Sequence, residues 1–136
     1  LRPPTEAEAR LASDGPGAAA VKDWLDRYFA NKAPDPRGLR LRAEGSPFRK
    51  VIWELLLTIP YGETRTYGDL ARKLEYDGIY TSARAVGGAV GHNPISVIIP
   101  CHRVLGAGGK LTGYAGGPAA KIWLLRHEGI LIPGEI

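Results

Sequence analysis

The tetrapeptide Pro100-Cys101-His102-Arg103 holds the residue types best suited to covalent chemistry in this sequence. Cys101 is the only cysteine, so the chain can form neither an internal disulfide nor a zinc site with several cysteines. A lone cysteine is most often a small buried apolar residue. Here His and Arg follow it, and neighbouring positive charge lowers the pKa of a thiol. We therefore interpret Cys101 as a reactive thiol, with the buried apolar residue as the alternative.

A nucleophilic cysteine needs a base, and the base needs a group that orients it. His102 is adjacent in the chain, and since adjacent side chains are often kept from direct contact, we expect a water to bridge it to Cys101. Glu128 and His127 could each orient this imidazole if the last helix packs back on the loop. The residue types alone do not choose between them.

The elements that position these residues belong to one domain of ordinary size. The chain has 136 residues, of which 44% are hydrophobic and 24% charged, as in typical soluble domains, which excludes a disordered or fibrous chain. It contains no apolar run of membrane-spanning length and no signal-peptide pattern, so nothing indicates secretion and we expect no membrane contact. The lone thiol fits a reducing, cytoplasmic location, or a nuclear one in a eukaryote. The net charge of +4 is compatible with nucleic acid but is weak evidence alone.

Hydrophobic periodicity and capping residues predict five helices after a tail over residues 1–17. Ser46-Pro47 is typical of a helix start, and Thr66 with Asp69 fits a capping box. Two short helices with a tight connection indicate a helix-turn-helix or, equally, an unrelated small bundle. The expected helices cover residues 18–31, 47–58, 67–74, 81–91 and a segment that begins at 118.

The glycine-rich segment after Cys101 predicts a β-hairpin. Residues 104–105 and 110–112 would be its strands, and 106–109 its turn, which would form the wing of a winged helix. Residues 95–99 are interpreted as a short buried extended segment, and Gly129 as the cap of the last helix.

Several motifs in this chain together resemble one family. The segment Ile99-Pro100-Cys101-His102-Arg103-Val104 is similar to the active-site signature of the O6-alkylguanine-DNA alkyltransferases. The similarity runs in order from about Trp24 to Gly129. Its other segments are 60–64, Thr66-Tyr67, 82–89, Gly91-His92-Asn93-Pro94, 111–117 and 121–129.

The resemblance implies a mainly α fold: a winged helix-turn-helix alkyltransferase domain with a short β-hairpin wing, preceded by a linker helix. Residues 1–45 would be a tail and the linker helix, and 46–136 the alkyltransferase domain. The family usually carries an N-terminal sheet domain, which we expect to be absent here. The lack of methionine agrees with a chain that is the C-terminal catalytic part.

The resemblance also implies a reaction. The protein would bind double-stranded DNA through the minor groove as a monomer and flip out O6-alkylguanine, chiefly O6-methylguanine and also O4-methylthymine. It would transfer the alkyl group irreversibly to Cys101, one repair per molecule, with neither cofactor nor metal.

The family's functional residues carry over one by one. Cys101 would accept the alkyl group, His102 would be the base, Glu128 would orient it, Asn93 would tie the recognition helix to the active-site turn, and Tyr67 would donate to the flipped base. The base pocket would involve Tyr114, Ala115, Val104, Gly116 and Lys121. DNA would be contacted by Arg84, which intercalates, and by Tyr67, Thr66, Ala83 and Gly87.

Plainer interpretations stand beside these. Arg84 could be an ordinary phosphate-contacting or solvated arginine, Asn93 a turn residue, and Tyr67 and Tyr114 core residues. The small residues of 83–89 would admit a narrow groove or allow close helix packing inside the domain. Three other functions compete: an alkyltransferase-like lesion binder, which lacks the acceptor thiol, a winged-helix regulator with a structural or redox-sensing cysteine, and a thiol hydrolase.

Overall fold

The computed structural model describes residues 18–39, 41, 44–112, 114 and 117–131. The predicted tail, Ala115 and Gly116 lie outside these residues. The helices are α2 (Ala18–Phe29), α3 (Pro47–Leu56), α4 (Tyr67–Tyr76), α5 (Ala83–Gly91) and α6 (Pro118–His127). Short 3-10 turns are η2 (Pro36–Gly38), η3 (Cys101–Arg103) and η4 (Ala107–Gly109), and the two strands are β1 (Arg65–Thr66) and β2 (Val104–Leu105).

Side chains cap the N-termini of the three central helices, where the first backbone N–H groups have no partner inside the helix. The Ser46 hydroxyl accepts from the Arg49 N–H at the start of α3. Thr66 and Asp69 form a reciprocal capping box on α4, and Ser82 caps α5. These caps confirm the predicted starts of α3 and α4. All five helices form, and each bound that was predicted agrees within two residues.

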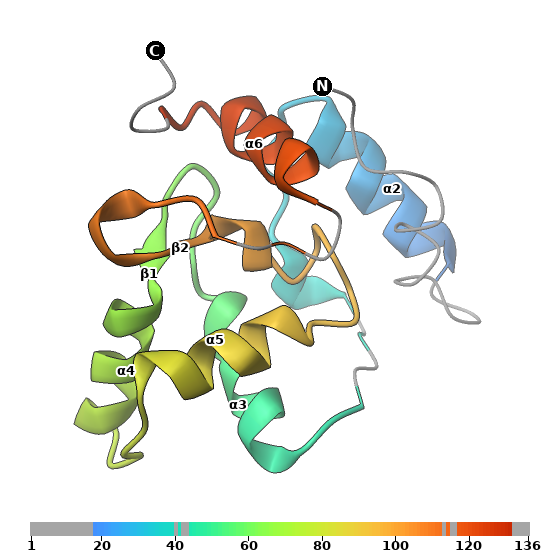
Figure 1. The fold of residues 1–136 in the computed structure, drawn as a ribbon. Coiled ribbons are helices and arrows are strands. Elements are labelled where there is room, and N and C mark those ends of the chain that lie inside the picture. The colour runs from blue at the N-terminus through green and yellow to red at the C-terminus, as the bar shows by residue number, and fades with distance from the viewer. Residues whose placement is uncertain (1–17, 40, 42–43, 113, 115–116, 132–136) are drawn as a thin grey trace.

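Helices α3, α4 and α5 pack together below the sheet in Figure 1, with α5 in contact with both of the others. Their apolar faces bury Leu70, Leu74 and Val86. Trp53 joins α3 to α5, because its indole N–H donates to the carbonyl oxygen of Ala89 at 2.9 Å in the core. The mainly helical fold and the helix-turn-helix interpretation are confirmed.

The predicted hairpin is wrong. β2 pairs with β1 in parallel, Arg65 opposite Val104 and Thr66 opposite Leu105. Residues 110–112 form no strand. The glycines allow a different turn: Gly108 and Gly109 have φ of 72° and 82°, and the chain coils into η4 instead of running straight back. One backbone bond, from Gly106 N–H to the Lys110 carbonyl oxygen, closes this loop.

The segment over 95–99 is buried as predicted but is not extended. It makes successive turns, with Val97 at a φ of 71°. A short buried apolar run does not by itself distinguish a strand from a compact loop, and here the loop leads from α5 into η3.

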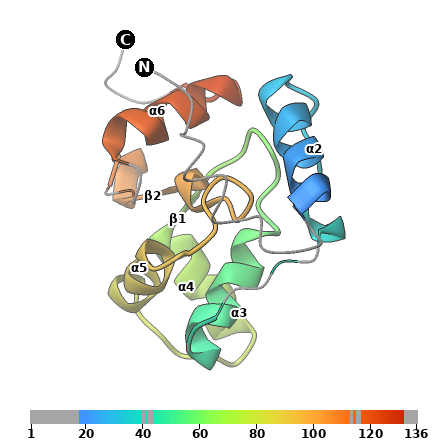
Figure 2. The same ribbon diagram turned by 90° about the vertical axis from the view of Figure 1, so that its right-hand side faces the viewer.

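Helix α2 lies against the C-terminal end of α6, at the top of both views (Figures 1 and 2). Aromatic rings fill the contact: Phe29 with Trp123 at 5.8 Å, and Tyr28 with His127 at 5.1 Å between ring centroids. None of the described helices is long and apolar enough to cross a membrane.

Candidate functional site

Cys101 begins the 3-10 turn η3, directly before the parallel strand β2, and all three residues of η3 are buried. Asn93 holds the loop that leads into this turn. Its Nδ2 donates to the carbonyl oxygen of Ile99 at 2.8 Å, and its Oδ1 accepts from the Ile95 N–H at 3.0 Å. Asn93 therefore fixes both ends of 95–99 between α5 and Cys101. These are the contacts expected of the predicted tie.

Glu128, the residue after α6, is the centre of a buried hydrogen-bond network. Its Oε2 accepts from His102 Nε2 at 2.6 Å, from Tyr28 Oη at 2.6 Å and from Arg103 Nη2 at 3.1 Å. Its Oε1 accepts from Arg103 Nε at 2.8 Å and from the Gly62 N–H at 2.9 Å. The network brings together residues from α2, the loop before β1, η3 and the end of α6.

Glu128 is thus the partner of His102, and the alternative partner is excluded. The ring of His127 bonds elsewhere, to the carbonyl oxygen of Tyr28 at 2.8 Å. The sequence left these two residues open, and the hydrogen bonds decide between them.

The protonation of the pair follows from its surroundings. Burial opposes a charged Glu128, but the hydrogen bonds from His102 and Arg103, the charge of Arg103 and, at acid pH, that of a protonated His102 outweigh it and lower the pKa of Glu128 to about 2. An ionised carboxylate only accepts, so the proton of a neutral His102 is on Nε2. Burial lowers the pKa of His102, which favours this neutral form. Its Nδ1 then carries a lone pair, and that buried atom has no hydrogen-bond partner among the described residues.

The thiol does not have the environment that its neighbours in sequence predict. Burial raises the pKa of Cys101, while a hydrogen bond from Asn93 and the charge of Lys121 oppose the rise. The expectation that His102 and Arg103 lower the thiol pKa is therefore wrong, because Arg103 turns to Glu128 and His102 is neutral. Cys101 is a protonated thiol at rest, and its activation needs a base.

A second chain of hydrogen bonds runs from α6 to α4. Lys121 Nζ donates to the Val104 carbonyl oxygen at 2.7 Å and to Thr112 Oγ1 at 3.2 Å, and Thr112 Oγ1 is 2.7 Å from Tyr67 Oη. Lys121 is 1% exposed, and burial lowers its pKa to about 8, a shift that only an ionised Cys101 would oppose. Lys121 thus contacts the carbonyl of Val104, another residue of the predicted base pocket. The Val104 carbonyl retains a second lone pair for a ligand.

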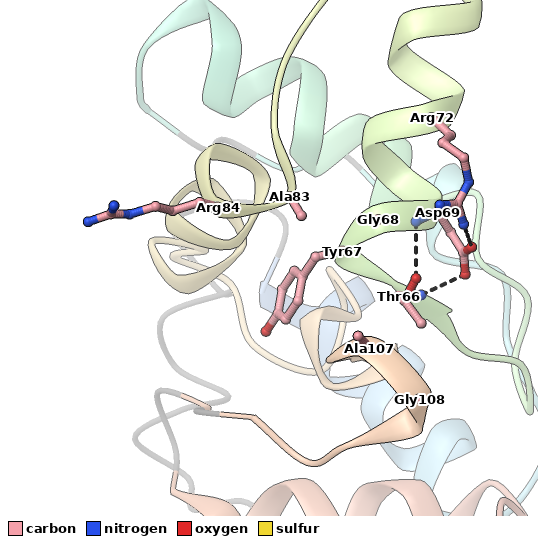
Figure 3. Close-up of a pocket in the computed structure, with 9 residues that line it drawn as sticks. All are labelled: Thr66, Tyr67, Gly68, Asp69, Arg72, Ala83, Arg84, Ala107 and Gly108. Carbon is pink, nitrogen blue, oxygen red and sulfur yellow. Dashed lines mark hydrogen bonds and ion pairs between the residues drawn. The ribbon is translucent and has the colours of Figure 1, made fainter.

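Most of the predicted DNA-contacting residues line one open depression of about 600 Å³. In Figure 3 Tyr67 lies between the start of α5 and η4, and Arg84 extends away from the protein. The depression does not include Cys101. Its lining residues are Thr66, Tyr67, Gly68, Asp69, Arg72, Ala83, Arg84, Ala107 and Gly108.

Internal packing does not account for the glycines of α5. A Cβ on Gly87 would only reach the Tyr67 ring at an ordinary 3.7 Å, and a Cβ on Gly88 or Gly91 would meet nothing within 4 Å. Close helix packing inside the domain is therefore not the reason for these glycines, although it does apply to Ala89, which is buried where α3 meets α5.

Four residues of these networks could not be identified from the sequence. Tyr28 lies within the predicted helix over residues 18–31, and no sequence pattern marks it as a partner of Glu128, although a buried tyrosine hydroxyl needs a hydrogen-bond partner. Arg103 is predicted from its place in the sequence to act on the neighbouring thiol, whereas its side chain pairs with Glu128. The backbone N–H of Gly62 and the hydroxyl of Thr112 left no pattern that could have identified them. Of the predicted pocket residues, Tyr114 is partly buried against the core.

The fold and the site define a helix-turn-helix protein that buries a single cysteine beside a histidine–carboxylate pair. A family model described as "6-O-methylguanine DNA methyltransferase, DNA binding domain" matches residues 47–130. The chain is 46% identical over 127 residues to the methylated-DNA–protein-cysteine methyltransferase of Shigella flexneri, covering 93% of this chain and 71% of that one. The chain belongs to the O6-methylguanine DNA methyltransferase family.

Solved structures agree with this membership. The crystal structure of Mycobacterium tuberculosis OGT in complex with DNA is 48% identical, with a TM-score of 0.73 over 82% of this chain and 66% of that chain. Schizosaccharomyces pombe Atl1, in complex with damaged DNA containing O6-carboxymethylguanine, is 30% identical, with a TM-score of 0.54 over 65% of this chain and 82% of that one. The chain thus spans 66% of the mycobacterial chain's length.

Proposed function

We propose that this chain repairs DNA by transferring the alkyl group of O6-alkylguanine, chiefly methyl, to Cys101. The family membership and the names of its relatives support DNA binding and methyl transfer to a protein cysteine. One observation carries the assignment of residues: His102 Nε2 is 2.6 Å from Glu128 Oε2, while the buried Nδ1, one residue from the thiol, has no hydrogen-bond partner among the described residues.

The transfer balances with groups of this chain and one water. The thiol proton of Cys101 passes through the water to His102 Nδ1, and the sulfur forms a bond to the alkyl carbon. The bond from that carbon to guanine O6 breaks, and its electron pair restores the C6 carbonyl. A ring nitrogen of the base takes a proton from Tyr67. Solvent then returns a proton to Tyr67, and His102 releases to solvent the proton that it took from the thiol. No cofactor enters this balance, and the thioether consumes the protein after one repair.

The contacts of Tyr67 support its role as a donor to the base. Because Lys121 donates to Thr112 Oγ1, the hydroxyl hydrogen of Thr112 is available to donate to Tyr67 Oη. Tyr67 then keeps its own hydrogen for the flipped base. We propose that Lys121 contributes to the base site in this indirect way and that Val104 accepts from the base amine.

The surface of α5 supports approach to a narrow groove. A stacked guanine must leave the duplex to reach a buried thiol. Ala83 and Arg84 are exposed at the N-terminal end of α5, and Gly88 opens to solvent. We propose that α5 enters the minor groove as a monomer binds, and that Arg84 occupies the gap that the base leaves.

Lesion binding without transfer is the second candidate, since the chain is also similar to Atl1. The presence of Cys101 with a basic imidazole favours transfer. The test is the mass of the intact protein after reaction with duplex DNA that carries O6-methylguanine: a gain on Cys101 supports transfer, and tight binding without a gain supports the second candidate.

A further inference from the structure

The linker helix α2 reaches into the site through one side chain. Tyr28 is fully buried, and its hydroxyl donates to Glu128 Oε2 at 2.6 Å. The same oxygen accepts from His102 Nε2, also at 2.6 Å. One carboxylate oxygen therefore serves both the proposed base and a phenol from an element far away in sequence.

The position of Tyr28 is fixed on several sides. Its ring stacks on Trp24 at 5.5 Å and meets the edge of Tyr61 at 5.7 Å. Its backbone carbonyl oxygen is bonded to His127 Nε2 at 2.8 Å. With ring and backbone both held, the hydroxyl has one fixed direction, toward Glu128.

We propose that Tyr28 is a positioning residue for the alkyl transfer, because its hydroxyl holds Glu128 Oε2 in place and shares the charge of that oxygen with His102. This inference rests on the proposed function and adds α2 to the machinery of the reaction. A hydrogen bond to a charged group is stronger than one between neutral groups, so its removal has a measurable effect on the other donors.

The direction of the effect follows from the two donors on one oxygen. Without the Tyr28 hydroxyl, more negative charge on Oε2 acts on His102, which raises the pKa of His102 from its lowered value. A phenol that is a stronger donor does the opposite. The titratable and charged groups around the pair are Tyr28 from α2, Tyr61 from the loop before β1, Cys101 and Arg103 from η3, and Lys121 and His127 from α6.

The experiment measures single-turnover alkyl transfer from O6-methylguanine in duplex DNA between pH 5 and pH 9 with the full chain. For Tyr28→Phe we expect the acid limb of the pH–rate profile, where the rate falls as the pH is lowered, to move to higher pH by about half a pH unit to one pH unit. The plateau rate should stay within about threefold of the parent. Tyr61→Phe is the matched control, since its hydroxyl bonds to the His127 carbonyl oxygen and to Asn31, not to Glu128. Its acid limb stays in place.

A second variant decides the question if Tyr28→Phe does not fold. Incorporation of 3-fluorotyrosine at position 28 keeps the ring and strengthens the donor, and we expect the acid limb to move down. An acid limb that stays in place in the folded variants, with lower stability alone, would overturn the proposal and leave Tyr28 a packing residue.

An NMR titration of the His102 ring separates this proposal from the proposed function. If the parent chain transfers no alkyl group, the proposed function fails. A His102 pKa that rises in Tyr28→Phe and falls with 3-fluorotyrosine then still supports the coupling between Tyr28 and the pair. A His102 pKa that is the same in all three proteins overturns it.

Discussion

Arg103 forms a buried ion pair with Glu128 through two hydrogen bonds. Its Nε donates to Oε1 at 2.8 Å and its Nη2 donates to Oε2 at 3.1 Å, while Nη1 donates to the Ile59 carbonyl oxygen at 2.7 Å. The planar guanidinium matches the carboxylate in this two-point arrangement. Arg103 therefore keeps Glu128 ionised and oriented, and it acts on the thiol only through that network.

Loss of this pair is expected to destabilise the fold strongly. Arg103→Met leaves Glu128 with its charge buried and its main partner gone, and we expect the free energy of unfolding to fall by about 3–5 kcal/mol in urea titrations. Arg72→Met removes an exposed partner of Asp69 and is the control, with a loss below about 1 kcal/mol. Equal losses in the two variants would contradict the role given to Arg103.

The pH dependence of transfer reports on His102. Burial lowers its pKa below the usual 6.5, so the neutral form persists as the pH falls through 6.5. We expect the single-turnover rate to hold from pH 8 to 6.5 and to fall only at lower pH, when Nδ1 becomes protonated. His102→Gln should slow transfer by about 100-fold or more, and His92→Gln, at an exposed histidine, should not. A rate that is flat at acid pH would indicate another base.

Arg84 is expected to matter for duplex DNA and not for stability. Its side chain is exposed, so Arg84→Ala should change the free energy of unfolding by no more than about 0.5 kcal/mol. Repair of duplex DNA should weaken markedly, and reaction with the free O6-alkylguanine base should weaken less. Lys32→Ala removes the same charge from an exposed position after α2 and serves as the control. Equal losses on both substrates would exclude intercalation.

Substitution of Gly88 is expected to affect stability and repair of duplex DNA in opposite directions. Gly88 lies one turn after Arg84 on the same face of α5, and a Cβ there meets no other atom. Gly88→Ala should therefore stabilise the helix, by up to about 1 kcal/mol, while it impairs repair of duplex DNA. A variant that is more stable and repairs duplex DNA at the parent rate would contradict the close approach of α5 to the groove.

The helices could be predicted from local signals, and the strand pairing could not. Ser46, Thr66 and Asp69 cap their helices as predicted, because capping depends on residues within one turn. The pairing of β1 with β2 joins residues that lie far apart in sequence, and two-residue strands have too little pattern to reveal it. The hairpin was predicted only from the glycine-rich composition of residues 106–109.

The site, too, could be predicted from the sequence only in part. The motif around Cys101 pointed to the thiol and its neighbour His102, whereas the choice of Glu128 over His127 came only from the family resemblance. The sequence did not show which way these side chains point. Arg103 donates to Glu128, Lys121 donates to the Val104 carbonyl oxygen, and Tyr28 reaches Glu128 from α2. Each of these depends on how two elements pack. The roles of Ala115 and Gly116 stay predictions, since both lie outside the described residues.

The central claim is that Cys101 itself receives the alkyl group. The most direct measurement is mass spectrometry of the intact chain, and then of its peptides, after incubation with excess duplex DNA that contains O6-methylguanine. Transfer predicts a gain of one methylene group on the peptide with Cys101, one guanine restored per chain, and no gain in Cys101→Ser. Restored guanine in excess of the protein, or restored guanine with an unchanged protein mass, would contradict it.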